Sequence, residues 1–422
     1  MFRWRIAILV SAAIAISYMD RQTLPVAIKA IREDVPVTDG QFADLNIAFL
    51  VTYALMYAGG GKLMDALGTR RGFALIMVFW SLACASHGLA ATLAMLVMSR
   101  LLLGVGEGGG FPAATRAMAE WFSVKERSLA MGIMNAGTAI GGIVAPIFIA
   151  LVLDRLHLHW RWVFFISGAT GLLWTLWWRR DYYTPDRHPR LSETERVAIK
   201  AAVATGSADK EEAGVALRWI DLLRFRQVWG VVGAKFFSDA AWYFYLFWLP
   251  KYLYDARHLD IKQVGYYAWI PHAAAGVGCL VGGALSAWLV QRQSSVNVSR
   301  KAALGASAAL MPFVFLIPSV PIAWVIVFFA IAYFGQQSWS TLVMTLPADL
   351  FPRRAVGAVA GLVGFGGAMG GVCFLKGVGY MLDHGSGYGP VFAMAGTFHI
   401  LAFGIICLAI PVVRPCAVAD PS

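Results

Sequence analysis

Ala119-Glu120-Trp121-Phe122, followed by Gly132, Gly137, Gly141 and Gly142, is a stretch that occurs twice in this 422-residue chain. The second copy is Ala348-Asp349-Leu350-Phe351, followed by Gly361, Gly366, Gly370 and Gly371. Every matched pair is 229 residues apart, which indicates an internal repeat. Glycines in membrane helices let neighbouring helices approach closely. The repeat therefore predicts two similar halves, each with a glycine-rich helix packed against another helix.

The composition around this repeat is that of a membrane protein. Hydrophobic residues make up 59% of the chain and charged residues 14%, whereas soluble domains contain about 25% charged residues. Backbone in lipid must satisfy its own hydrogen bonds, and long apolar segments do so as helices. We predict an all-α membrane protein with twelve transmembrane helices in two six-helix halves. The predicted spans are 4–31, 42–67, 72–91, 93–118, 128–153, 161–178, 228–254, 264–290, 302–318, 322–346, 356–382 and 389–413.

The distribution of positive charge orients these spans. With the N-terminus inside, 23 of the 35 Lys and Arg residues lie in cytoplasmic segments and six in external loops. This asymmetry predicts that both termini are cytoplasmic. It also accounts for the net charge of +11, so we expect the lipid bilayer and not nucleic acid as a partner. The one long polar segment, 179–226, is predicted to be a cytoplasmic linker with a short amphipathic helix between an N-terminal half (1–178) and a C-terminal half (227–422).

Charged residues inside the predicted spans are candidates for function, because they are costly at membrane depth. Arg100 and Glu107 in span four are seven residues apart and therefore share a helix face. Asp20 and Arg21 in span one are adjacent and point about 100° apart, so they cannot face one partner. Arginine suits a carboxylate ligand, and a carboxyl group in a low-dielectric site can carry a proton. These charges fit proton-coupled anion import; the alternative is that they only neutralise each other and hold helices together.

Several motifs resemble a known family. The loop Gly61-Lys62-Leu63-Met64-Asp65-Ala66-Leu67-Gly68-Thr69-Arg70-Arg71 is similar to the cytoplasmic signature loop of the major facilitator superfamily. The segments listed next resemble its anion:cation symporter family, and in particular the bacterial hexuronate transporters, over nearly the whole chain. They are Tyr18-Met19-Asp20-Arg21-Gln22, Arg100 to Pro112, Lys235 to Asp239, Trp242 to Lys251, Trp339-Ser340, Leu346 to Pro352, and Gly370-Gly371 with Lys376 to Tyr380.

The resemblance implies roles for individual residues. Asp20 and Glu107 would be protonation sites, and Arg21 and Arg100 would govern those sites and the substrate carboxylate. Tyr18 and Tyr53 match tyrosines that line a sugar-acid site. Asp65, Arg70 and Arg71 would act in gating, by latching the two halves together. The resemblance also implies a multi-pass protein of the bacterial inner membrane.

The sequence departs from this branch at three positions where asparagine is usual. Ser17 precedes the span-one tyrosine, Gly110 precedes Phe111-Pro112, and Ala139 follows Gly137-Thr138. Three missing amides mean fewer groups that read substrate hydroxyls. The resemblance therefore leaves the individual substrate open.

Further polar residues in the spans allow two interpretations each. Lys235 and Asp239 are spaced for either an intrahelical ion pair or a gating role. Lys376 could snorkel to the interface, pair with a neighbouring helix or contact the substrate.

Polar groups in spans five and ten are equally ambiguous. Span ten contains Gln337 and Trp339, and span five contains Asn135 and Thr138, one turn apart. Each pair suits either a polyol substrate or interhelical hydrogen bonds.

We interpret the chain as a proton-coupled symporter that imports an organic anion, a hexuronate or related sugar acid, by alternating access. Alternatives are an importer of another organic acid, aromatic or dicarboxylate, and a drug exporter of the same fold. Exporters carry G-P-x-x-G-G in span five, whereas here Gly141-Gly142 precedes Pro146. A membrane enzyme would need a catalytic or metal-spaced cluster, which the sequence lacks. We expect no enzyme activity, no cofactor and no metal, and a monomer whose partners are a small-molecule anion and the proton.

Overall fold

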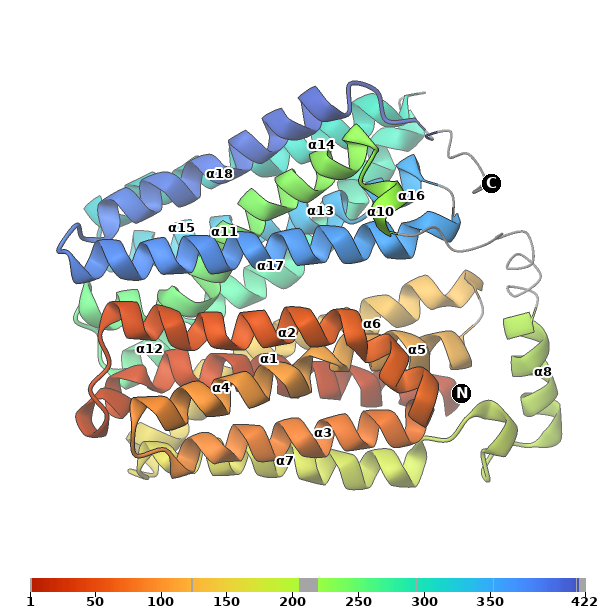
Figure 1. Ribbon diagram of the computed structural model, residues 1–422, viewed down its shortest axis with the longest axis horizontal. Helices are drawn as coiled ribbons and strands as arrows, with labels where there is room; N and C mark the ends of the chain where they lie inside the picture. The colour runs from red at the N-terminus through yellow and green to blue at the C-terminus, as the bar shows by residue number, and fades with distance from the viewer. Residues whose placement is uncertain are drawn as a thin grey trace. The chain divides into compact units, whose positions relative to one another are not determined.

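The computed structural model describes residues 2–122, 124–204, 219–292, 295–351, 353–414 and 416, and in these residues it contains helices and no strands (Figure 1). The helices of the first part of the chain are α1 (Phe2–Asp34), α2 (Asp39–Leu67), α3 (Thr69–Ser86), η1 (His87–Leu89), α4 (Leu93–Gly108), α5 (Gly110–Trp121), α6 (Val124–Ala150), η2 (Leu151–Arg155), α7 (Trp160–Asp181), η3 (Pro185–Arg187) and α8 (Glu193–Ala204). Those of the second part are α10 (Trp219–Leu222), α11 (Arg226–Asp255), α12 (Ile261–Tyr267), α13 (Trp269–Arg292), α14 (Val296–Ala309), η4 (Met311–Ser319), α15 (Ile322–Val343), α16 (Leu346–Leu350), α17 (Arg353–Asp383) and α18 (Tyr388–Ala409).

These helices form twelve segments of membrane-spanning length, several of which join two consecutive elements. Nine are both long and apolar enough to cross a membrane, counting only the described residues. The other three are α2, α7 and α11, with 29, 22 and 30 residues. Many Trp and Tyr residues in α7 and α11 depress the mean hydropathy, although such residues are common in membrane helices near the interface. The prediction of an all-α membrane protein with twelve helices is confirmed.

The chain divides into two compact units. Unit 1 comprises residues 1–37, 48–212 and 260–266, and unit 2 comprises residues 38–47, 213–259 and 267–422. The predicted halves, 1–178 and 227–422, differ from these units by two exchanged segments, 38–47 and 260–266, and by the linker between them.

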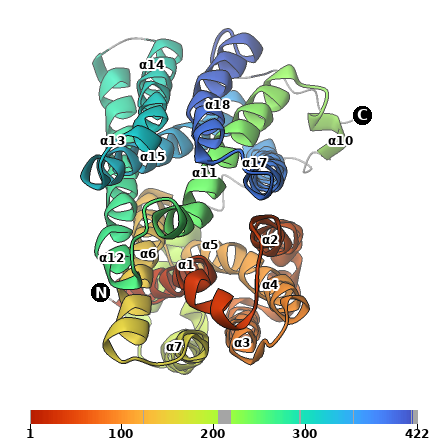
Figure 2. The ribbon, with the colours of Figure 1, turned by 90° about the vertical axis from the view of Figure 1, so that its left-hand side faces the viewer.

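The same helix pair occurs in each unit. In unit 1 α6 packs along α1, and in unit 2 α17 packs along α11; Figure 2 shows α17 nearly end-on with α11 beside it. Gly141 of α6 lies against the backbone of α1 at Ala15, and Gly370 of α17 lies against the backbone of α11 at Phe236. A side chain at either glycine would collide with backbone, which cannot move aside as a flexible side chain can. The repeated glycines therefore set the close approach of both pairs.

The start of the predicted linker contains the expected short helix. α8 follows Ser192, whose hydroxyl oxygen accepts a hydrogen bond from the backbone N–H of Glu195 at 3.3 Å. The Glu195 carboxylate accepts one from the backbone N–H of Ser192, also at 3.3 Å. This reciprocal capping box fixes the helix N-terminus. Residues 205–218 of the linker lie outside the described residues, and its last part contains α10.

Candidate functional site

An ion pair between α1 and α4 lies inside unit 1. Arg21 of α1 donates from Nε to Oε2 of Glu107 on α4 at 2.7 Å. The hydroxyl of Ser17 donates to the same oxygen at 2.7 Å. Ser17 and Arg21 are four residues apart and therefore face α4 together. The side chains of Arg21 and Glu107 are only 4% and 0% exposed, so the two charges depend on each other for stabilisation.

Pro25 lies inside α1 and interrupts its backbone hydrogen bonds near this ion pair. Proline has no N–H, so the carbonyl of Arg21, four residues earlier, lacks its usual helical donor. The hydrogen-bond ladder of α1 is therefore incomplete at the residue that carries the guanidinium.

Asp20 faces another helix, as its position beside Arg21 predicts. The hydroxyl of Ser167 on α7 donates a hydrogen bond to Oδ1 of Asp20. Asp20 is 1% exposed, and Ser167 is completely buried. The two acidic groups of the predicted site therefore contact different helices. Glu107 on α4 contacts α1, and Asp20 on α1 contacts α7.

Arg100 is completely buried in α4. None of its guanidinium nitrogens has a hydrogen-bond partner among the described residues. Its guanidinium lies 5.8 Å from the ring centroid of Phe49, whereas the hydrogen bonds to Glu107 come from Arg21 and Ser17. A buried charge without hydrogen bonds is unfavourable by several kcal/mol. A planar guanidinium has the shape to bind an anion with two oxygens, such as a carboxylate.

Aromatic rings surround the guanidinium of Arg21. Its Cζ lies 4.7 Å from the ring centroid of Tyr18, 4.4 Å from that of Tyr53 and 5.4 Å from that of Phe49. Phe49 and Tyr53 are themselves stacked, with centroids 5.6 Å apart. Cation–π contacts of this kind stabilise a guanidinium and fix its orientation. The structure therefore brings together Tyr18, Arg21, Tyr53 and Glu107, with Arg100 on the same helix as Glu107.

A second polar cluster lies inside unit 2. Lys235 and Asp239 of α11 form an ion pair at 2.9 Å, with side chains 9% and 10% exposed. Lys235 also donates to the hydroxyl of Ser340 on α15 at 2.8 Å. The amide of Gln336 donates to Asp239 at 3.5 Å, and its carbonyl oxygen contacts Nε2 of His399. The intrahelical pair thus forms, and it also connects α11 with α15 and, through Gln336, with α18.

The other candidates in spans five and ten have varied surroundings. Asn135 is exposed on α6, and the hydroxyl of Thr138 donates to its backbone carbonyl at 2.8 Å. Gln337 is half-buried on α15. Trp339 is completely buried in the hydrophobic core of unit 2, with its ring centroid 5.5 Å from that of His399.

Lys376 pairs with a neighbouring helix, which is one of the alternatives left by the sequence. Its Nζ lies 2.6 Å from Oδ1 of Asp44, and the two side chains are 62% and 48% exposed. The adjoining N-terminus of α2 is capped by Asp383, whose oxygens accept hydrogen bonds from the backbone N–H groups of Asp39 and Gly40 at 2.9 and 2.8 Å. These contacts belong to unit 2.

In the predicted gating loop, Arg70 anchors α3 to the end of α7. It donates to the carbonyl oxygens of Tyr182 at 2.7 Å and Arg179 at 2.6 Å, and its Cζ lies 3.9 Å from the ring centroid of Tyr183. It therefore satisfies carbonyl groups that the end of a helix leaves free. Arg71 is exposed, and the side chain of Asp65 lies outside the described residues.

Two serines belong to the site although the sequence did not mark them as site residues. Ser17 hydrogen-bonds to Glu107, and Ser167 to Asp20. Ser17 has a signal in the sequence, because it is one helical turn before Arg21 and so shares its face. Ser167 has none, since its role depends on which helix lies beside Asp20.

Comparison with known proteins identifies similar chains. The sequence pattern of the Major Facilitator Superfamily matches residues 10–375. The chain is 31% identical over 412 residues to the hexuronate transporter of Escherichia coli (strain K12), covering 96% of this chain and 93% of that protein. It is 33% identical over 315 residues to the galacturonate transporter of Dickeya chrysanthemi, covering 73% and 89%. The crystal structure of a bacterial homolog of the human lysosomal transporter Spinster, inward-facing and occupied, has a TM-score of 0.74 at 18% identity and 97% coverage of both chains, which indicates a shared fold.

Proposed function

Because the chain belongs to the Major Facilitator Superfamily, we propose that this membrane transporter is a proton-coupled symporter that imports an organic anion, a hexuronate or a related sugar acid, by alternating access. The observation that carries the proposal is the buried guanidinium of Arg100, whose nitrogens lack hydrogen-bond partners among the described residues. The similarity to transporters of hexuronate and galacturonate supports a sugar acid as the anion. We further propose that the protein lies in the bacterial inner membrane, with both termini in the cytoplasm.

The geometry suggests how a proton and an anion would be coupled. Glu107 as a carboxylate holds Arg21 through a buried hydrogen bond. A proton on Glu107 would remove the negative charge that stabilises this guanidinium. Arg21 would then require another anion, and the carboxylate of the substrate would supply it. Substrate binding and protonation of Glu107 would thus favour each other, which is the linkage that a symporter needs.

The remaining groups would orient the substrate. In the proposal Arg100 binds the same carboxylate as Arg21, through its planar fork. The tyrosine rings at 18 and 53 keep the guanidinium of Arg21 in position. Their hydroxyl groups are of a type that reads sugar hydroxyls. Asp20, which hydrogen-bonds to Ser167 on another helix, would be a second protonation site.

Binding measurements test the anion and its ligand. Purified protein is titrated at two pH values with glucuronate, galacturonate, galactonate, glucarate and simple aromatic acids, and the shift in Tm is recorded. We expect sugar acids to stabilise the wild type and the Arg100→Gln variant to lose this stabilisation. Arg155→Gln, which removes an exposed arginine of the same unit, is the matched control and should respond like wild type. A response only to neutral sugars or cationic drugs would show that the anion proposal is wrong.

Uptake into proteoliposomes tests the coupling. The Glu107→Gln variant keeps the shape of the side chain but cannot exchange a proton. We expect it to lose accumulation driven by a pH gradient while it retains some exchange of labelled substrate across the membrane. Full accumulation by this variant would contradict the role proposed for Glu107.

A further inference from the structure

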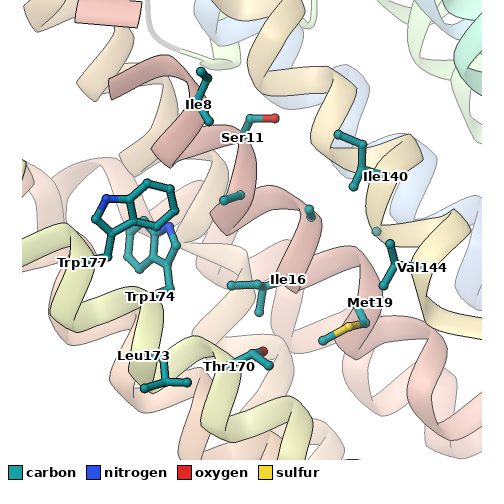
Figure 3. A pocket seen from close by; sticks show the side chains of 13 residues that line it. Ile8, Ser11, Ile16, Met19, Ile140, Val144, Thr170, Leu173, Trp174 and Trp177 are labelled. Atoms are coloured by element: carbon teal, nitrogen blue, oxygen red, sulfur yellow. The ribbon is translucent and has the colours of Figure 1, made fainter. Parts of the chain in front are cut away.

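Unit 1 contains an apolar groove that the proposed transport cycle does not use. It has a volume of about 560 Å³ and lies between α1, α6 and α7. Figure 3 shows Ile8, Met19, Ile140, Val144, Trp174 and Trp177 along its walls. Ile8, Ile140, Val144 and Trp177 are among the exposed apolar side chains of the protein. The groove therefore opens to the apolar surroundings of a membrane helix bundle.

The length of the groove matches one leaflet of a bilayer. Its lining on α1 runs from Ile8 to Met19, eleven residues along the chain, which is about 16 Å at the rise of an α-helix. The hydrocarbon core of a bilayer is about 30 Å thick, so the groove spans about half of it. The indole N–H of Trp177 at one end donates to Asp181 at 3.0 Å. Tryptophan with a polar partner is typical of the membrane interface, so this end lies at the headgroup level.

Two arginines extend the groove at that end. Arg5 precedes Ile8 by three residues on α1, and Arg180 follows Trp177 by three residues on α7, so each continues the lining face of its helix. Both are exposed, and the side chain of Arg180 is 76% accessible.

The acidic group next to Arg180, Asp181, is already neutralised. Asp181 accepts from Arg190 at 2.9 Å, and Arg180 is farther from it, at 3.9 Å. The interfacial end of the groove therefore carries net positive charge.

We propose that this groove is a binding site for an anionic phospholipid, with an acyl chain between α1, α6 and α7 and the headgroup phosphate at Arg5 and Arg180. Any lipid can fill an apolar groove, so the selectivity for an anionic headgroup comes from the arginines. A basic side chain near an anionic lipid surface favours binding about fivefold, so the two together favour it about 25-fold. Because the N-terminus is proposed to be cytoplasmic, the end of the groove near Arg5 would lie in the cytoplasmic leaflet. This assignment rests on the proposed topology, whereas the groove and its charge do not.

Native mass spectrometry of the full-length protein tests the headgroup. The protein is purified in detergent with equal amounts of phosphatidylglycerol and phosphatidylcholine, and the retained lipids are counted. We expect wild type to retain phosphatidylglycerol preferentially and the double variant Arg5→Gln, Arg180→Gln to reduce this preference about 25-fold. The double variant Arg224→Gln, Arg292→Gln removes the same charge from exposed positions of unit 2 and should keep the preference. An equal preference in all three proteins, or an equal loss in both variants, would refute the site.

A second variant tests the acyl chain. Ala12→Phe places a ring in the groove without changing charge, and all arginines remain. We expect this variant to retain less phosphatidylglycerol than wild type, while its helix content by circular dichroism is unchanged. Retention at the wild-type level would show that the phosphate binds without a chain in the groove. Because neither variant alters Arg100 or Glu107, sugar-acid binding should persist in both, which separates this inference from the proposed function.

Discussion

Replacing the charges of the Arg21–Glu107 pair singly and together should show strong coupling. In Arg21→Gln the Glu107 carboxylate keeps the hydrogen bond from Ser17 but loses its cation. In Glu107→Gln the guanidinium of Arg21 loses its anion in a site where its side chain is 4% exposed. The double variant leaves two neutral amides, which can hydrogen-bond to each other, and it removes both charges of this pair from the protein interior.

The structure sets the size of these effects. Removing one partner of a buried ion pair costs about 3–5 kcal/mol. We expect the lower end, about 3 kcal/mol for each single variant, because the pair is already incomplete: Oε1 of Glu107 and Nη2 of Arg21 have no hydrogen-bond partner among the described residues. Replacing both partners by neutral groups is often nearly neutral, so the double variant should lose about 1 kcal/mol or less. The two single losses add up to about 6 kcal/mol, so the resulting coupling energy is about 5 kcal/mol.

Unfolding in mixed detergent micelles, followed by tryptophan fluorescence, measures the free energies of wild type, both single variants and the double variant. The exposed pair of Lys376 and Asp44 provides the control cycle, with Lys376→Gln and Asp44→Asn. The coupling energy of this exposed pair should be about 1 kcal/mol or less, because solvent screens its charges. Additive losses at Arg21 and Glu107, with the double variant the least stable, would show that the two charges do not stabilise each other and would refute the reasoning.

Three further predictions follow from individual contacts. Gly141→Ala should destabilise the protein by about 1–3 kcal/mol, because the new methyl group meets the backbone of α1; Gly132→Ala on the same helix, where that space is open, should be neutral or stabilising in the same unfolding assay. Burial lowers the pKa of His188, whose Nδ1 accepts a hydrogen bond from the backbone N–H of Arg190. The unfolded chain therefore binds a proton at this residue more readily than the folded protein, and stability should fall as pH drops below about 6.5. His188→Gln should reduce this pH dependence of the melting temperature across pH 5–8. Lys251→Met should destabilise unit 2 in thermal melts, because the completely buried Lys251 side chain lies 2.5 Å from Asp39 and also contacts Asp255; a melting temperature equal to wild type would contradict that role.

Local sequence pattern and composition were sufficient to predict the fold. Span length, the low charge content and the 229-residue repeat depend on the chain alone, since a segment in lipid must be helical whatever surrounds it. The repeated glycines indicate that one helix of each half approaches another helix closely, and the structure identifies the partners, with Gly141 against α1 and Gly370 against α11. Spacing along one helix likewise offers an ion pair between Lys235 and Asp239 as one of two alternatives, because residues four apart share a face, and this pair forms in the structure.

Partners on different helices were decided by the tertiary structure. The sequence shows that Arg100 and Glu107 share a face, but not that Glu107 pairs with Arg21 while the nitrogens of Arg100 have no hydrogen-bond partner among the described residues. Nor does it show that Ser167 contacts Asp20. A helix face can be read from periodicity, because the helix is a local structure. Which helix packs against that face, and which buried group is left without a hydrogen bond among the described residues, depends on packing between segments as far apart as Asp20 and Ser167. That packing exists only in the folded protein.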